Sequence, residues 1–459
     1  MYSIRSGPCS VFGLLVSIAV AAVAYLEINN PAHGQMRCSS KVARHRIIGA
    51  YRTDERRQSV VEITQPDDAK ANDGLKKASA AKITSDVKAA AQSNNQFAFD
   101  LYKQSKEPIG NQIFSPVSIS TGLAMISAGA KGETKKQMSQ VLHLDLPDPN
   151  VQTGFGKLNA ILNTQSKNYR LNMANRLWGQ KGFRFEPQFV KLTSENYGAE
   201  LGIVDFAEPE QARQTINQWT AAHTGGKIPE LLPHGLLNGN VRFVLTNASY
   251  FKGTWQYRFA KETTRDAVFH DLKNREVKVP MMNQTGAFQY GENADLQVLE
   301  LPYVGGELSM VILLPKKVDG LLALYKKLTA SDVQKWASGL EHVDEVEIYM
   351  PKFTFTTQIR LKDVLSSMGM PLAFSDAADF SGITTQQEQK LYESIHQAFV
   401  DVNEEGTEAA AVTGHVGGNA PGPVPRHVVF RADHPFLFLI QDKRTGAILF
   451  LGRVANPNG

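Results

Sequence analysis

The chain carries none of the residue patterns that mark common catalytic sites. It has no G-x-S-x-G, H-E-x-x-H or Walker sequence, and no G-x-G-x-x-G after a predicted strand. Its eleven histidines are scattered, and no pair lies at i, i+4 beside a carboxylate. The glycine-rich run GHVGGNAPG, residues 414–422, lacks the following helix and the lysine that phosphate binding needs. We therefore expect no catalytic residues, no metal site and no cofactor.

One segment, residues 402–430, combines residue types with a clear chemical consequence. The sequence VNEEGTEAAAVTG predicts the end of a strand followed by small or β-tolerant side chains. Seven of the twelve residues 414–425 are Gly or Pro. This composition excludes a regular helix or strand and predicts an exposed, protease-accessible loop. The plain alternative is a surface linker that joins two strands.

The elements that must position this loop are predicted to be helices first and strands later. A helix begins near residue 84, with Ser85 placed to cap it. A second begins at Ser115, where Pro116 occupies the first-turn position that tolerates a missing N–H. It is expected to run to about residue 131, and Gly132 marks the break before a third helix at 133–144.

From residue 240 the pattern changes to runs of β-branched and aromatic residues at strand lengths. Six such runs are RFVLTNASY, LSMVILL, EVEIYM, QAFVDV, FLFLI and AILFLGRV. The last two are joined by QDKRTG, a hairpin connection that contains Gly446. Helices followed by sheets predict a single α+β domain over residues 84–459.

Length and composition agree with one large domain plus an extension. The 459 residues contain 49 basic and 45 acidic side chains, so the net charge is +4. This mild balance gives no support to a nucleic-acid platform or a polybasic membrane surface. The two cysteines, Cys9 and Cys38, exclude a disulfide scaffold.

The amino terminus is a separate piece. Arg5 precedes an apolar run at residues 11–26, and Ala22 and Ala24 supply a small-x-small cleavage pattern. We expect a signal peptide at residues 1–24 and hence a secreted, extracellular protein. The alternatives are an uncleaved membrane anchor through residues 11–26 and a buried helix. Residues 25–83 are polar without sustained periodicity and predict a disordered linker.

From Val87 to Pro457 the chain resembles the serpin superfamily. The resemblance rests on NNQFAFDLY, IFSPVSISTGLAMISAGAKGET, LTNASYFKGTW, LELPY, LSMVILLP, VDVNEEGTEAAA, FRADHPFLFLI and GRVANP, in family order. It implies a fold of three β-sheets and about nine helices with an exposed reactive-centre loop. It also implies a suicide inhibitor that traps a serine protease as an acyl-enzyme by inserting the cleaved loop into the main sheet. The implied partner is therefore a serine protease, bound covalently, and the inhibitor is expected to be monomeric.

The resemblance assigns a role to particular residues. The hinge that starts insertion comprises Glu404, Glu405, Gly406, Thr407, Glu408, Ala409, Ala410, Ala411 and Val412. Because side chains alternate along a strand, Thr407, Ala409, Ala411 and Thr413 would share one face, which in this family faces the core. Ser115, Ser118, Asn247 and His396 match the polar shutter cluster beneath the opening strands, and Trp255 matches the breach where insertion begins. The alternative for these residues is ordinary buried packing.

The family spacing places the scissile carbonyl on Ala420, so Pro421 would follow the scissile bond. Most serine proteases cleave poorly before a proline. The bond is therefore Ala420–Pro421, Asn419–Ala420, Val416–Gly417 or one near Gly422. None of these residues is basic, acidic or a large aromatic, so an elastase-like or subtilisin-like protease with a shallow pocket is the expected target. We expect that trypsin-like enzymes are not trapped at Arg426. Cleavage there would place the preceding prolines in the inserted strand, where proline cannot donate a backbone hydrogen bond. A non-inhibitory serpin-fold binding or structural protein is the alternative function.

Overall fold

The computed structural model describes residues 82–104, 110–163, 166–386, 390–407 and 426–459. These residues form nine α-helices, which fall mainly in the first half of the described chain. They are α2 (Ser85–Lys103), α3 (Pro116–Ser127), α4 (Gly132–Val141), α5 (Asp148–Leu162), α6 (Pro187–Tyr197), α7 (Pro209–His223), α8 (Leu321–Lys327), α9 (Ala330–Ser338) and α10 (Leu361–Met368).

The described strands are distributed over the whole chain and are concentrated in its second half. They are β1 (Gln112–Phe114), β2 (Tyr169–Gln180), β3 (Gly202–Val204), β4 (Phe243–Thr254), β5 (Arg265–His270), β6 (Glu276–Glu292), β7 (Leu296–Pro302), β8 (Leu308–Pro315), β9 (Glu341–Pro351), β10 (Phe353–Arg360), β11 (Glu393–Val402), β12 (Gly406–Thr407), β13 (His427–Arg431), β14 (Phe436–Asp442) and β15 (Ile448–Val454).

The described strands form two sheets. The six-stranded sheet has the order β10-β11-β4-β2-β3, with β12 paired to β4. The nine-stranded sheet has the order β1-β15-β14-β8-β7-β6-β9-β13, with β5 paired to β6. Strand β6 changes register between Gly286 and Phe288. By pairing, the described strands therefore form two sheets, one fewer than expected from the sequence, because β6 pairs with both β7 and β9 as one continuous strand.

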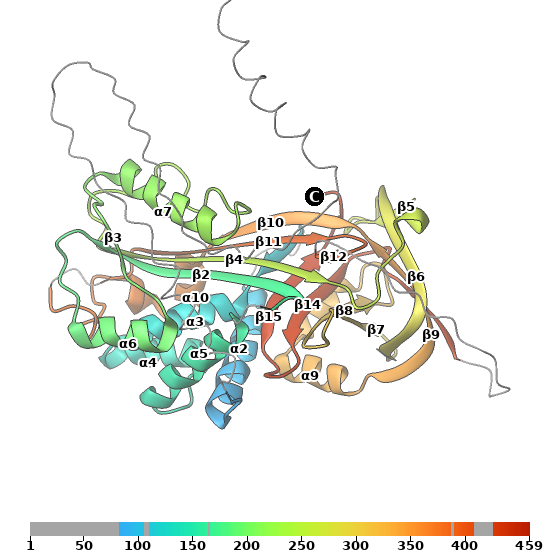
Figure 1. The fold of residues 1–459 in the computed structure, drawn as a ribbon, viewed down its shortest axis with the longest axis horizontal. Helices are drawn as coiled ribbons and strands as arrows, with labels where there is room; N and C mark the ends of the chain where they lie inside the picture. Colours follow the sequence, from blue (N-terminus) through green and yellow to red (C-terminus); the bar gives the residue numbers. More distant parts are fainter. Residues whose placement is uncertain (1–81, 105–109, 164–165, 387–389, 408–425) are drawn as a thin grey trace, which may run out of the picture. The chain divides into compact units, whose positions relative to one another are not determined.

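The six-stranded sheet lies between two helical layers, with α7 above it and α2 to α5 on the opposite side (Figure 1). The face toward α3 is here called the core face, and Asn247 of β4 contacts Ser118 of α3 on it. The face toward α7 is the outer face, where Val244 and Ala248 of β4 cluster with Ile216 of α7. The central strand β4 therefore buries both of its faces, whereas the edge strand β10 exposes alternate residues.

The helix starts follow the sequence closely, with two shifts. Ser115 caps α3 as predicted, because its Oγ accepts a hydrogen bond from the Ser118 N–H at 3.3 Å and Pro116 is the first helical residue. The cap of α2 is Thr84 instead of Ser85. The third helix includes Gly132, whose φ of +52° suits a residue without a Cβ.

The prediction that helices precede strands is incomplete, because β2 lies within the helical half. Its sequence, YRLNMANRLWGQ, is rich in Leu, Met, Ala and Arg, which favour helices when taken alone. Pairing with β4 along eleven residues makes it a strand. Tertiary packing thus overrides local preference at β2.

Gly122 sets the distance between α3 and β4. A Cβ at this position would lie 2.6 Å from Asn247 Nδ2 and 3.4 Å from a methyl carbon of Leu245. Only a residue without a side chain lets the helix approach the sheet this closely.

Replacing Gly122 with Ala is therefore expected to destabilise the intact chain by about 1–3 kcal/mol, because the helix or Asn247 must move. Urea denaturation measures this change. Gly110→Ala is the matched control, because no atom lies within 4 Å of the added Cβ. Equal stabilities of the two variants would contradict the argument.

Candidate functional site

The boundary between β4 and β11, here called the seam, is open at one end. The two strands are parallel neighbours from the pair Val244–Glu393 to the pair Tyr250–Phe399. Strand β4 continues to Thr254, but beyond Tyr250 it no longer pairs with β11. At its last two residues it pairs instead with β12, where Gly406 lies opposite Thr254 and Thr407 opposite Gly253. The first residues of the predicted loop thus already occupy the open end of the seam, antiparallel to β4.

Trp255 lies where this short strand joins the sheet. It is 1% exposed, and its ring stacks on Tyr303 with centroids 4.6 Å apart and an interplanar angle of 13°. Its indole N–H donates to the Asn403 carbonyl at 3.0 Å, and its backbone N–H donates to the Glu405 carbonyl at 3.1 Å. The structure therefore places the predicted breach residue in direct contact with the start of the hinge.

Glu404 anchors the hinge from the other side. Its carboxylate is buried and accepts hydrogen bonds from Lys352 Nζ at 3.0 Å and Thr264 Oγ1 at 2.9 Å. Burial raises the pKa of this carboxyl, but hydrogen bonds from its own backbone N–H, Lys352 and Thr264 outweigh burial, so the pKa lies below its ordinary value. Sequence reasoning identified Glu404 but not its two partners.

Gly406 turns the chain into the sheet. Its φ is +120°, and a Cβ would stand 2.3 Å from the Gly253 carbonyl oxygen and 2.6 Å from the Trp255 nitrogen. Its N–H and C=O exchange hydrogen bonds with Asn403 at 3.2 and 3.0 Å. Glycine is therefore required here both by the backbone conformation and by the close approach to β4.

The four predicted shutter residues come together beneath the seam. The Ser115 N–H donates to His396 Nε2 at 3.0 Å, and Ser115 Oγ caps the N–H of Ser118. The Ser118 hydroxyl donates to Asn175 Oδ1 at 2.6 Å, and Asn247 Nδ2 donates to the same oxygen at 3.1 Å. Asn175 of β2 is a member that sequence reasoning missed. The sequence offered no clear signal for it, because β2 also contains Arg170, Asn172 and Arg176.

Asn247 and His396 face each other across the seam as register partners. Both are fully buried. Burial lowers the pKa of His396 to about 3, so the imidazole is neutral. Because Nε2 accepts from Ser115, the ring proton belongs on Nδ1. Neither this Nδ1 nor Asn247 Oδ1 has a hydrogen-bond partner among the described residues. The seam thus holds one unpaired donor and one unpaired acceptor.

The remaining predicted site residues, Glu408–Val412 and Asn419–Pro421, lie outside the described residues. Arg426 is described, and its guanidinium forms a 2.9 Å ion pair with Glu292 of β6.

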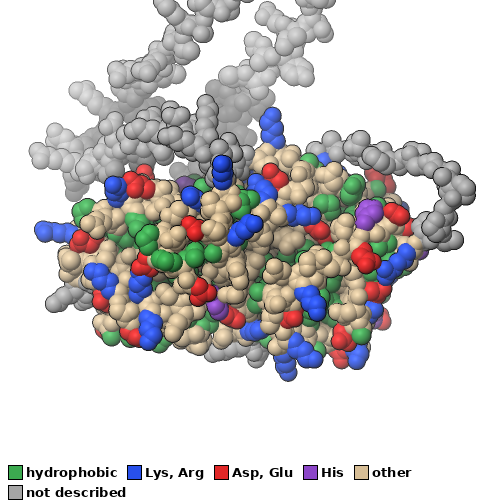
Figure 2. All heavy atoms as spheres, turned by 90° about the horizontal axis from the view of Figure 1, so that it is seen from below, with side chains coloured by type: hydrophobic (Ala, Val, Ile, Leu, Met, Phe, Trp, Pro, Cys, Tyr) green, Lys and Arg blue, Asp and Glu red, His purple; other side chains and the backbone are tan. Residues whose placement is uncertain are grey.

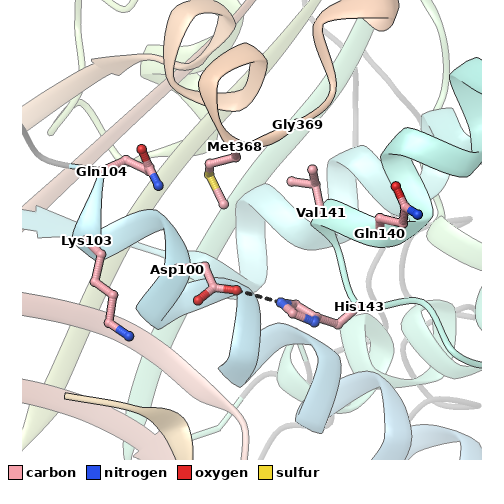
Figure 3. Close-up of a pocket in the computed structure, with 8 residues that line it drawn as sticks. All are labelled: Asp100, Lys103, Gln104, Gln140, Val141, His143, Met368 and Gly369. Atoms are coloured by element: carbon pink, nitrogen blue, oxygen red, sulfur yellow. Dashed lines mark hydrogen bonds and ion pairs between the residues drawn. The ribbon is translucent and has the colours of Figure 1, made fainter. Parts of the chain in front are cut away.

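Two further features of the described part of the chain are a pocket and the distribution of charge on its surface. A pocket of about 240 Å³ lies between α2, α4 and α10, where Asp100 and His143 are 2.7 Å apart (Figure 3). None of the predicted site residues lines it. On the face seen in Figure 2, the described Lys and Arg side chains alternate with Asp and Glu, in agreement with the small net charge.

Comparison with known proteins gives consistent matches. Residues 92–457 match the family Serpin (serine protease inhibitor). Leukocyte elastase inhibitor from Bos taurus is 44% identical over 375 residues, covering 79% of this chain and 98% of the relative. The Homo sapiens protein of the same name is 42% identical with the same coverage. Among solved structures, human thyroxine-binding globulin complexed with thyroxine has a TM-score of 0.74 and 31% identity, and uncleaved ovalbumin 0.73 and 29%. Each covers 81% of this chain and 100% of the neighbour.

The prediction of a secreted, extracellular protein is wrong. The matched relatives are leukocyte elastase inhibitors, which are intracellular serpins that lack signal peptides. The same relatives give no evidence for the alternative of a membrane anchor through residues 11–26, a segment outside the described residues. In the part of the chain that the structure describes, no helix is long and apolar enough to cross a membrane.

The buried His396 predicts how the intact chain responds to acid. Its folded pKa of about 3 lies below the ordinary value of 6.5, so the unfolded chain binds this proton first as the pH falls. The contribution of His396 to the free energy of unfolding should be constant above pH 7. It should fall between pH 6.5 and 3, by about 1.4 kcal/mol per pH unit.

Urea denaturation at pH 7.5 and pH 5.0 measures the effect. His396→Gln should remove this part of the pH dependence, whereas His342→Gln, at an exposed site, should retain it. An unchanged pH dependence in the His396 variant would show that this residue is not its source.

Proposed function

Because the chain belongs to the serpin family and has its fold, we propose that it is a suicide-substrate inhibitor of serine proteases. It is not an enzyme, since its relatives are protease inhibitors. The observation that carries the proposal is the pairing of Gly406 and Thr407 with β4 at the open end of the seam. A strand that has begun to enter a sheet is ready to continue once its far end is released. The chain acts as a monomer and needs no cofactor.

Cleavage supplies that release. The serine oxygen of the protease attacks a carbonyl of the reactive loop, the peptide bond breaks, and the new amine leaves with the downstream segment. The upstream segment remains joined to the protease as an ester. It then extends β12 along β4 and carries the protease with it. Distortion of the protease against the inhibitor stops water from completing hydrolysis.

The observed register predicts what the inserted strand would contact. Continued from Thr407–Gly253, the pairs on the core face are Ala409–Phe251, Ala411–Ser249 and Thr413–Asn247. Those on the outer face include Glu408–Lys252 and Val412–Ala248. Small side chains therefore enter the core, and the only charged one, Glu408, lies opposite a lysine. The opposite register would bury Glu408 on the core face at a high cost.

Thr413 would enter between the two unpaired groups of the shutter cluster. Its hydroxyl can donate to Asn247 Oδ1 and accept from the Nδ1–H of His396, which are register partners across the seam. Insertion would thus satisfy two buried polar atoms and add one ladder to the sheet. With about ten new backbone hydrogen bonds at about 1 kcal/mol each, the gain is about 10 kcal/mol.

In this register Gly417 lies opposite Phe243, the first residue of β4. Cleavage at any candidate bond from Val416–Gly417 to Ala420–Pro421 therefore leaves enough chain to cover essentially the whole strand. In this register the prolines before Arg426 would fall beyond β4. A protease tethered at Arg426 would therefore have slack chain and would not be pulled against the inhibitor, which disfavours a trypsin-like target.

The target is an elastase-like or subtilisin-like protease. The candidate bonds present only small or amide side chains, which suit a shallow pocket. The names of the relatives, leukocyte elastase inhibitors at 41–44% identity, support this choice. They also disfavour the alternative of a non-inhibitory binding or structural protein.

Replacing Thr407 with Arg is expected to convert the inhibitor into a substrate. Because Thr407 already pairs with Gly253 of β4, the arginine would have to be covered on the core face as the strand extends past it, where an unpaired charge costs several kcal/mol. The ratio of covalent complex to cleaved chain on a denaturing gel should fall at least about tenfold. Thr407→Ser, which keeps a small polar side chain, is the control. Equal ratios for wild type and the arginine variant would contradict loop insertion.

Incubation with elastase, subtilisin and trypsin tests the target. We expect a denaturant-resistant complex with elastase or subtilisin, and cleavage without a complex by trypsin. Mass spectrometry of the released carboxyl-terminal fragment identifies the bond among the candidates. A stable trypsin complex mapped to Arg426 would show that the proposed specificity is wrong.

A further inference from the structure

Lys227 lies over the seam on the outer face of the sheet. Its ammonium nitrogen is 5.4 Å from the ring centroid of Phe399 on β11 and 5.9 Å from that of Tyr250 on β4. The two rings are register partners and form the last pair of the β4–β11 ladder. Their centroids are 6.0 Å apart. One cation therefore contacts both sides of the seam at the point where it opens.

The position of Lys227 is fixed by the turn that follows α7. Gly225 and Gly226 adopt φ values of +61° and +77°, and the Gly226 N–H donates to the Ala221 carbonyl at 2.8 Å. The next residue, Ile228, is fully buried, and its N–H donates to Thr224 Oγ1 at 3.2 Å. Hydrogen bonds thus fix the backbone of the turn on both sides of Lys227, and this fixed backbone holds the ammonium close to the two rings.

We propose that Lys227 is a latch that holds the seam closed in the intact protein and limits the rate of loop insertion. Neighbouring strands lie about 4.8 Å apart, so a strand between β4 and β11 would separate Tyr250 and Phe399 by about twice that distance. A cation attracts an aromatic ring only within about 6 Å of its centroid. One ammonium cannot keep both contacts after insertion, so at least one must break as the seam opens. The latch rests on the proposed function, because it acts on the same insertion step.

Lys227→Met tests the latch, because methionine keeps an unbranched apolar side chain and removes the cation. Spontaneous conversion of the intact chain to an inactive, heat-resistant form at elevated temperature should accelerate by between about two- and thirtyfold. The thermal midpoint of the intact chain should fall by more than that of the loop-cleaved chain, because the cleaved chain has already lost at least one of the two contacts. Lys227→Arg, which keeps a cation that can lie over both rings, should convert at close to the wild-type rate.

An equal fall in the midpoints of the intact and cleaved chains would assign Lys227 an ordinary packing role and overturn the latch. A conversion rate of Lys227→Met equal to that of wild type would do the same. A coupling test distinguishes cation from packing: adding Phe399→Leu to Lys227→Met should accelerate conversion less than it does in wild type. Failure of the proposed function is recognised separately, since wild type would then form no covalent complex with any serine protease.

Discussion

The structure depends on one incomplete ladder, the pairing of β4 with β11. These two parallel strands separate beyond Tyr250 and Phe399, and the first two residues of the reactive segment pair with β4 in the opening. In Figure 1, α3 lies on one side of this sheet, and α7 lies on the other side toward the end away from β12. The open seam is therefore the feature on which the proposed insertion mechanism depends.

The residues around the seam hold it in a state that is satisfied only in part. Glu404 and Trp255 fix the hinge firmly at the entrance. Deeper in the seam, Asn247 and His396 each leave a buried polar atom without a partner among the described residues. Buried unpaired groups raise the energy of the state that contains them. Contacts at the open end of the seam thus stabilise the intact protein, whereas the unpaired polar atoms deeper in the seam destabilise it. The proposed insertion would relieve this second, unfavourable contribution.

Much of this arrangement could be predicted from the sequence, and the failures have physical causes. The capping pair Ser115 and Pro116 predicted the start of α3, because a cap is a local property. The strand β2 and its Asn175 were missed, because only pairing with β4 makes that segment a strand. The register that pairs Thr407 with Gly253 cannot be read from the sequence, since it depends on where β12 meets β4. The prediction of export was wrong, and it rested on residues 1–24 alone, which lie outside the family match at residues 92–457.

The most direct test of the account is the thermal stability of the protein before and after cleavage of the reactive segment by a protease that does not become trapped. If the segment inserts as proposed, it adds a strand and pairs the groups at Asn247 and His396, so the cleaved chain should unfold at a midpoint at least about 10 °C above that of the intact chain. If cleavage leaves the midpoint unchanged or lowers it, the segment does not enter the seam and the chain is not a suicide inhibitor.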